Sequence, residues 1–290
     1  MSGAREEGVR DTLSRHGLHA SRERGQNFLR DDAVAERLVR HAGVSDADAV
    51  IEIGPGLGVL TRALAARARA VTAIEIDAGL VRALRADAAL PPAVSLLHAD
   101  ALEVDLRGLA ERLGRPVRVV ANLPYAISSR LLRRLLDLAD VLADWSVMLQ
   151  REMAERVVAP PGTRDYGSLA VLHALRVRAA GSLEIGPGAF FPVPRVASRF
   201  LRLVPIAAAL APGELEAVER VARAAFGQRR KTIANALRAG LGPGVEPEAL
   251  AAALAAAGID PRTRAEAQPP ERFLALARAL PGAGLPARRP

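Results

Sequence analysis

Short apolar runs alternate with longer amphipathic stretches through the first half of the chain. The runs have the length of buried strands, and the stretches between them carry apolar residues at helical spacing. Strands that alternate with helices predict a mostly parallel sheet covered on both faces. The expected strands are AVIEI (49–53), VTAIEI (71–76), VSLLHAD (94–100), VRVVANL (117–123) and SVMLQ (146–150), with two later strand-like runs, SLAVLHALRV (168–177) and SRFLRLV (198–204).

The last third of the chain shows only helical patterns, punctuated by proline and glycine. The segment PIAAALAPG separates it from the alternating part. We therefore expect a flexible N-terminal arm with one short helix over residues 1–24, an α/β domain over 25–207 and an all-α domain over 208–290. After the arm, Asp31 and Asp32 are expected to cap the start of a helix that ends at Gly43.

Composition narrows the function only a little. The 290 residues carry a formal net charge of +8, which favours an acidic partner such as nucleic acid. Lys231 is the one lysine among 40 basic residues, so much of the arginine excess fits a genome-wide preference. The absence of cysteine excludes disulfides and thiolate metal sites, and the five histidines show no metal spacing. With no signal peptide or membrane span in view, we expect a monomeric cytoplasmic protein without a metal.

A glycine-rich loop follows the first expected strand. It reads EIGPGLG and places Gly54, Gly56 and Gly58 at alternate positions before a helix. Glycine lets a ligand approach the backbone closely, and the helix N-terminus offers free N–H groups. The dinucleotide fingerprint has one more residue before its third glycine, so the spacing favours a nucleotide-like ligand without pyrophosphate. An ordinary strand-to-helix turn is the alternative.

The next two strands also end in acids. Glu75 can accept both hydroxyls of a ribose, and Asp100 can accept a hydrogen bond from an adenine amino group. Each acid alone is more often a cap or a solvated charge, but neighbouring parallel strands end at the same edge of a sheet. The pentapeptide EIGPG recurs at Glu184 to Gly188, where it lacks the third glycine and runs into AFFPVPR. We interpret this second copy as a turn.

The fourth strand ends in NLPY. The Asn122 amide oxygen and the Leu123 carbonyl can accept the two N–H bonds of an aromatic amine such as N6 of adenine. Pro124 would fix the turn, and Tyr125 would stack on a base flipped out of its helix. The alternative is a simple turn with a buried tyrosine.

These motifs resemble class I S-adenosylmethionine-dependent methyltransferases, and among them the ribosomal RNA adenine N6,N6-dimethyltransferases. The resemblance extends from about Arg24 to about Arg272. It rests on GQNFLRD, EIGPGLGVLT, NLPYAISS, MLQREMAERVVAPPGTRDYGSLAV, FFPVPRVASRFLRL and FGQRRKTIANAL. DYGSLAV and FGQRRKTIANAL are more similar to the KsgA type, which modifies the small ribosomal subunit, than to the Erm type, which modifies large-subunit RNA. Ala126 departs from the asparagine common in the KsgA type.

The resemblance implies a Rossmann-like fold with a mostly parallel seven-stranded sheet and a small all-α domain. It implies S-adenosyl-L-methionine as the cofactor, with contacts from Asn27, Leu29, Gly54, Glu75, Asp100 and Asn122 as well as the glycine loop. NLPY becomes the catalytic loop, and Phe191 a second face against the target base. Because Phe190 and Phe191 cannot both point into one pocket, a core aromatic beside a stiff loop is an equal alternative.

Arg229, Arg230 and Lys231 are expected to begin a helix and to hold RNA phosphates, although a solvated charged face is the plain alternative. The implied activity is dimethylation of two adjacent adenosines in a hairpin loop near the 3′ end of 16S rRNA, within an immature small subunit. Rival functions are an Erm-type large-subunit methyltransferase, a DNA adenine methylase, and a non-catalytic ribosome-assembly or transcription factor on the same fold.

Overall fold

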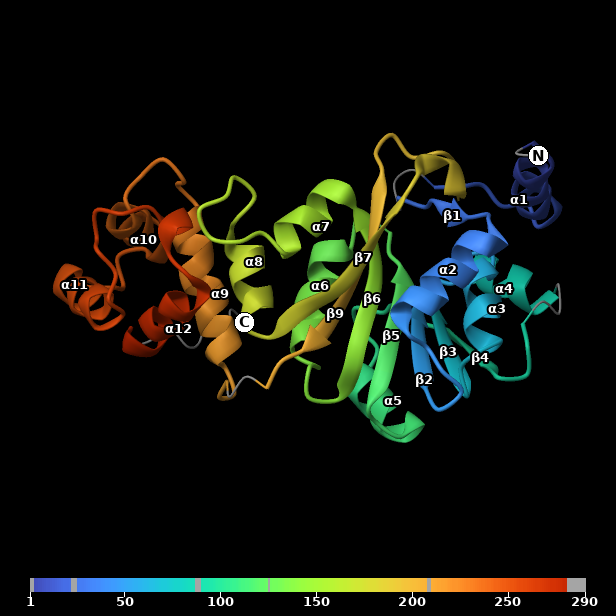
Figure 1. Ribbon diagram of the computed structural model, residues 1–290, viewed down its shortest axis with the longest axis horizontal. Coiled ribbons are helices and arrows are strands. Elements are labelled where there is room, and N and C mark those ends of the chain that lie inside the picture. The colour runs from blue at the N-terminus through green and yellow to red at the C-terminus, as the bar shows by residue number, and fades with distance from the viewer. Residues whose placement is uncertain (1–2, 22–24, 87–89, 125, 208–209, 281–290) are drawn as a thin grey trace. The chain divides into compact units, whose positions relative to one another are not determined.

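A seven-stranded sheet forms the centre of the α/β part of the chain (Figure 1). The computed structural model describes residues 3–21, 25–86, 90–124, 126–207 and 210–280. The first five strands in the sheet order are parallel, and the sixth is antiparallel to its neighbour. This confirms the predicted Rossmann-like class. The order is β4 (Val94–His98), β3 (Ala70–Glu75), β2 (Ala49–Ile53), β5 (Val117–Asn122), β6 (Leu142–Gln150), β9 (Ser198–Pro205) and β7 (Val177–Ile185).

The central strands are apolar because both of their faces are covered. Every side chain of β2 is buried, which fits a near-continuous apolar run rather than an alternating one. The helices that connect the strands are α2 (Asp32–Ala42), α3 (Val59–Ala65), α4 (Ala78–Ala86), α5 (Leu106–Leu113), α6 (Ser128–Leu136) and α7 (Arg151–Val157). No described helix is both long and apolar enough to cross a membrane.

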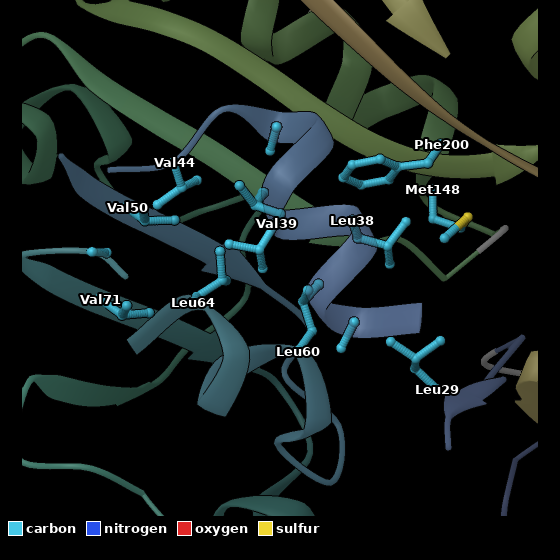
Figure 2. Close-up of a cluster of buried hydrophobic side chains, with 14 of the residues drawn as sticks. Leu29, Leu38, Val39, Val44, Val50, Leu60, Leu64, Val71, Met148 and Phe200 are labelled. Carbon is cyan, nitrogen blue, oxygen red and sulfur yellow. The ribbon is translucent and has the colours of Figure 1, made fainter. Parts of the chain in front are cut away.

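Helices α2 and α3 bury their apolar faces against one side of the sheet (Figure 2). Leu38 and Val39 of α2 and Leu64 of α3 are fully buried in this cluster, together with Val50 of β2 and Phe200 of β9. Burial of one such side chain contributes about 1.5–3 kcal/mol, so this cluster is a main source of stability for the α/β part of the chain.

The ends of α2 follow the sequence prediction. The Asp31 carboxylate accepts hydrogen bonds from the backbone N–H groups of Ala33 and Val34, at 2.9 and 3.2 Å. Gly43 ends the helix in the left-handed conformation with φ of 69°. The caps thereby fix where the chain enters and leaves this face of the sheet.

The N-terminal segment contains the expected helix, which packs against the α/β part of the chain. Helix α1 spans Gly3–Arg15, and its Val9 and Leu13 are buried in a cluster with Phe28 and Leu80. Val9 and Leu13 lie one helical turn apart and attach the helix to this cluster. The polar composition of the segment gave no indication of this packing. The following β1 (Phe28–Leu29) pairs antiparallel with β8 (Phe190–Phe191), which a 3₁₀ turn at Pro187–Ala189 precedes.

The chain divides into two compact units. The first combines Met1–Ala154 with Arg178–Pro205, and the second combines Glu155–Val177 with Ile206–Pro290. The segment after β6, from Glu155 to Val177, thus belongs to the second, helical unit. The helices of that unit are α8 (Ser168–Ala174), α9 (Glu214–Phe226), α10 (Ile233–Leu241), α11 (Pro247–Ala256) and α12 (Pro270–Ala279), with a 3₁₀ turn at Ala265–Ala267.

The prediction of a strand over residues 168–177 was wrong for most of that run. Residues Ser168–Ala174 form α8, and β7 begins only at Val177. Helix α8 packs against α9 and α12. Tyr166, just before it, is fully buried and donates a hydrogen bond from its hydroxyl to the carbonyl of Gln268 at 2.9 Å. These contacts hold the segment in the helical unit.

Candidate cofactor and acceptor site

A cavity of about 400 Å³ opens at the carboxyl ends of β2, β3, β4 and β5, all within the first unit. The N-terminal segment around β1 closes one wall of this cavity. The structure therefore places the strand-end residues around one cavity, together with Asn27 and Leu29 of the N-terminal segment. The predicted site residues that line the cavity are Asn27, Leu29, Gly54, Gly56, Glu75, Asp100, Asn122, Leu123 and Pro124.

The glycine loop comes close to the N-terminal segment. Gly56 has φ of 58°, and a Cβ at this position would lie 3.0 Å from Cδ1 of Phe28. A larger side chain here would strain the backbone and push Phe28 away. Gly58 does not line the cavity; instead, it starts α3 in the left-handed conformation.

The Glu75 carboxylate bridges the ends of two strands. One oxygen accepts a hydrogen bond from Gly56 N at 3.3 Å, and the other from Asp77 N at 2.9 Å. Its side chain is only 5% exposed, and this burial raises the pKa of Glu75, although the backbone N–H groups act in the opposite direction. Glu75 therefore orders the loop in addition to facing the cavity.

A second buried acid lies below the loop. Glu52 is on β2 and is 1% exposed. Burial raises the pKa of Glu52 to about 8, and the nearby charge of Glu75 acts in the same direction. The Thr61 side chain and the Arg62 charge act in the opposite direction and offset only part of this rise in pKa. Near neutral pH this carboxyl group is mostly protonated, which reduces the negative charge under the loop.

The ends of β3 and β4 each place a large apolar side chain near a carboxylate. Asp100 accepts a hydrogen bond from Leu102 N at 2.8 Å, and both residues line the cavity. Ile76, directly after Glu75, also lines it although it is 58% exposed. The sequence analysis missed Ile76 and Leu102. For Ile76 the available signal was a large apolar residue directly after a strand-end acid, since such a side chain can cover the face of a planar ring.

Asn122, at the end of β5, is held by the N-terminal segment. The Asn122 side-chain amide donates from Nδ2 to the carbonyl of Asn27 at 3.0 Å. This bond orients the amide, so its oxygen is the group left to act as an acceptor. The Pro124 carbonyl accepts from Ile127 N and from the Ser128 hydroxyl, each at 3.2 Å. The loop is thereby fixed to the first turn of α6.

The sequence predicted two aromatic contacts to the target base, from Tyr125 and Phe191. Tyr125 lies outside the described residues. Phe191 is not among the lining residues, because its side chain packs with α1 and Phe28 and the Arg10 guanidinium lies over its ring, 5.6 Å from the centroid. Phe190 is 1% exposed in the core cluster. Phe190 is thus a core aromatic, whereas Phe191 is half-buried against the cluster of α1.

The basic segment at Arg229 precedes its helix rather than beginning it, because α10 starts at Ile233. Within the second unit, Arg229 donates to the carbonyls of Tyr166 and Arg164 at 3.1 and 2.8 Å and pairs with Glu266 at 3.2 Å. These bonds give Arg229 a structural role that the sequence did not reveal. Arg230 and Lys231 are exposed.

The groups around the cavity suit a nucleoside that carries positive charge. Two carboxylates can face hydroxyl, amino or sulfonium groups, Ile76 can cover a ring, and the glycine loop leaves room for a chain. S-adenosylmethionine has all of these features. Asn27, Gly54, Glu75, Ile76 and Asp100 are the residues that would hold it.

Comparisons with known proteins agree with this reading. The model of the family "Ribosomal RNA adenine dimethylase" matches residues 17–281. The chain is 44% identical over 278 residues to ribosomal RNA small subunit methyltransferase A of Rhodospirillum rubrum, covering 95% of this chain and 93% of the relative. The protein of the same name from Methylococcus capsulatus is 43% identical, with 90% and 98% covered.

Solved structures show the same fold. The crystal structure of the 23S rRNA methyltransferase ErmE superimposes with a TM-score of 0.61 at 30% identity, covering 88% of this chain and 99% of that one. A dimethyladenosine transferase from Plasmodium falciparum gives a TM-score of 0.70 at 22% identity, with 86% and 95% covered.

Proposed function

Because this chain belongs to the ribosomal RNA adenine dimethylase family, we propose that it dimethylates N6 of two adjacent adenosines in 16S rRNA. The target lies in a hairpin loop near the 3′ end of that RNA, within an immature small subunit, so the enzyme acts in small-subunit biogenesis. The observation that carries the proposal is the cavity in which an oriented Asn122 amide joins the strand-end acids Glu75 and Asp100.

S-adenosylmethionine, when bound, supplies an electrophilic methyl group on a sulfonium. The protein contributes position and hydrogen-bond acceptors. The Asn122 amide oxygen and the Leu123 carbonyl accept the two N6 hydrogens of the target adenine, which favours a pyramidal nitrogen with its lone pair toward the methyl. Pro124 keeps this turn rigid, and Tyr125 stacks on the flipped base. The methylated amine is acidic enough to lose its proton to water, so no strong general base is required.

The identity of the RNA rests on the relatives. Proteins named small subunit methyltransferase A match nearly the whole chain at up to 44% identity, whereas the ErmE structure is 30% identical. We therefore favour small-subunit RNA over the Erm-type alternative. Arg230 and Lys231, with a smaller part for the partly engaged Arg229, would hold the RNA backbone through salt-sensitive contacts that do not read sequence.

Parallel methyl-transfer assays test the proposal. Labelled S-adenosylmethionine is supplied with unmethylated small subunits, large subunits, free rRNA or DNA, and the products are identified by nucleoside analysis. We expect N6,N6-dimethyladenosine in small-subunit RNA and little in the other substrates. Product in large-subunit RNA would favour the Erm-type function, and binding without methylation would favour a non-catalytic factor.

Asn122→Ala tests the catalytic assignment within the same assay. At saturating S-adenosylmethionine, turnover should fall by about 100-fold or more, since the amide acts mainly in the transition state. RNA binding should change far less. Asn235→Ala is a matched control, because Asn235 is an exposed asparagine of the helical unit whose side chain accepts a hydrogen bond from Arg238.

A further inference from the structure

The lining of the cavity includes one cationic side chain among the residues that the structure describes. Arg130 lies in the first turn of α6, which follows the catalytic loop. Its side chain is exposed, whereas Glu75 across the cavity is 5% exposed. The cavity thus has acids in its interior and an arginine at its rim.

Other arginines of α6 are engaged in the fold, and Arg130 is not. Arg133 pairs with Asp137 at 2.6 Å, and Arg134 donates to the carbonyl of Ala101 at 3.1 Å. Within the described residues, no hydrogen bond or ion pair is found for Arg130. A structural role therefore explains the first two side chains and leaves the third unexplained.

A nucleotide that places its base in this cavity brings two phosphates to the rim. The base can enter an apolar cavity, but the diester charges stay at its mouth, where each needs a counterion. We infer that Arg130 binds the phosphate next to the target adenosine and so positions that nucleotide for transfer. Arginine suits this role because its planar fork can hold two phosphate oxygens at once.

The competing ligand for Arg130 is the carboxylate of the cofactor. Two observations favour the RNA. Arg130 is on the helix that carries the acceptor loop, five residues after Tyr125, and not on the N-terminal segment or the glycine loop. Its side chain is also exposed, as expected of a group that meets a large ligand from outside.

This inference rests on the proposed function, and one set of assays separates the two. Arg130→Ala, Arg130→Lys and wild type are compared for transfer to unmethylated small subunits and for S-adenosylmethionine binding by calorimetry. Arg112→Ala is the matched control, because Arg112 is an exposed arginine of α5 in the same unit that does not line the cavity. Thermal unfolding checks that each variant is folded.

For Arg130→Ala we expect KM for the subunits to rise about tenfold, with cofactor affinity unchanged. In Arg130→Ala the slope of log affinity against log salt concentration should decrease by about one phosphate contact. Arg130→Lys keeps the positive charge and should recover part of the loss. Arg112→Ala should behave as wild type. A loss of cofactor affinity in Arg130→Ala would assign the arginine to the cofactor carboxylate and overturn the inference. If the wild type is active and Arg130→Ala has an unchanged KM, the inference is also overturned. An inactive wild type would refute the proposed function itself.

Discussion

The same five residues, EIGPG, occur twice in this protein and adopt two structures. At Glu52 to Gly56 they end a central parallel strand, and the last four, from Ile53 to Gly56, line the cavity. At Glu184 to Gly188 they end the edge strand β7 and continue into a 3₁₀ turn. In the first copy both glycines have positive φ, whereas Gly186 in the second has φ of −66°.

The surroundings of the two glutamates differ as much as the backbones. Glu52 is 1% exposed between covered faces of the sheet, but the side chain of Glu184 is 52% exposed and pairs with Arg199. A third glycine and a helix follow the first copy only. The comparison shows that a pentapeptide becomes a ligand loop through its strand position and the chain that follows it.

Replacing the last glycine of each EIGPG copy with valine should give the largest difference in S-adenosylmethionine affinity. Gly56→Val places a β-branched side chain at φ of 58° with its Cβ 3.0 Å from Phe28, so S-adenosylmethionine affinity should fall by about 2–3 kcal/mol. Gly188→Val has no atom within 4 Å of its Cβ and should leave the affinity unchanged. Calorimetry measures both.

Equal affinities for these two variants would show that the loop conformation is unimportant for the cofactor. Should Gly56→Val unfold, Gly56→Ala provides the smaller version of the same strain, and its affinity should still fall below that of Gly188→Ala.

The glutamates of the two copies should differ in how stability depends on pH. Burial raises the folded-state pKa of Glu52 from 4.5 to about 8, so its contribution is full below about pH 4.5 and is lost as pH rises to about 8. Glu52→Gln should remove this dependence, and from pH 5 to 9 the wild type should lose at least about 1–2 kcal/mol relative to the variant. Urea unfolding at several pH values measures the difference. Parallel curves would mean that Glu52 is ionised in the folded protein.

The smallest effect is expected at the second copy. Glu184→Gln removes an exposed ion pair with Arg199, and such pairs contribute less than about 1 kcal/mol. Thermal and urea unfolding at neutral pH should therefore nearly coincide with wild type. A loss of several kcal/mol would show that this turn is a structural anchor, and the contrast between the copies would then disappear.

Much of this arrangement could be predicted from local pattern. The apolar runs predicted the parallel strands, Asp31 and Gly43 predicted the ends of α2, and the third glycine separated the ligand loop from its copy. These features depend on neighbouring residues, which a sequence displays directly. The strand-end acids were also predicted to meet, because parallel strands end at one edge of a sheet.

Features that depend on distant packing could not be predicted. The run at 168–177 is mostly apolar, so its periodicity could not distinguish a buried helix from a strand. The helices α9 and α12 that pack against it come later in the chain. Phe191 faces α1 because of a pairing across more than half the chain, and the arm composition gave no sign of it. Likewise, only the packed structure shows that Arg133 and Arg134 of α6 have partners within the fold and that Arg130 differs from them.

The pairing of β1 with β8 has a consequence for biosynthesis. Phe28 faces Phe191 in register, and the same short segment carries Asn27, whose carbonyl holds Asn122. The centre of the sheet can assemble from adjacent strands as the chain emerges, but this clasp closes only after the residues of β8 have been made. A nascent chain that ends before β8 lacks the partner that fixes one wall of the cavity. We therefore expect the chain to bind the methyl donor only late in synthesis, once β8 has paired with β1.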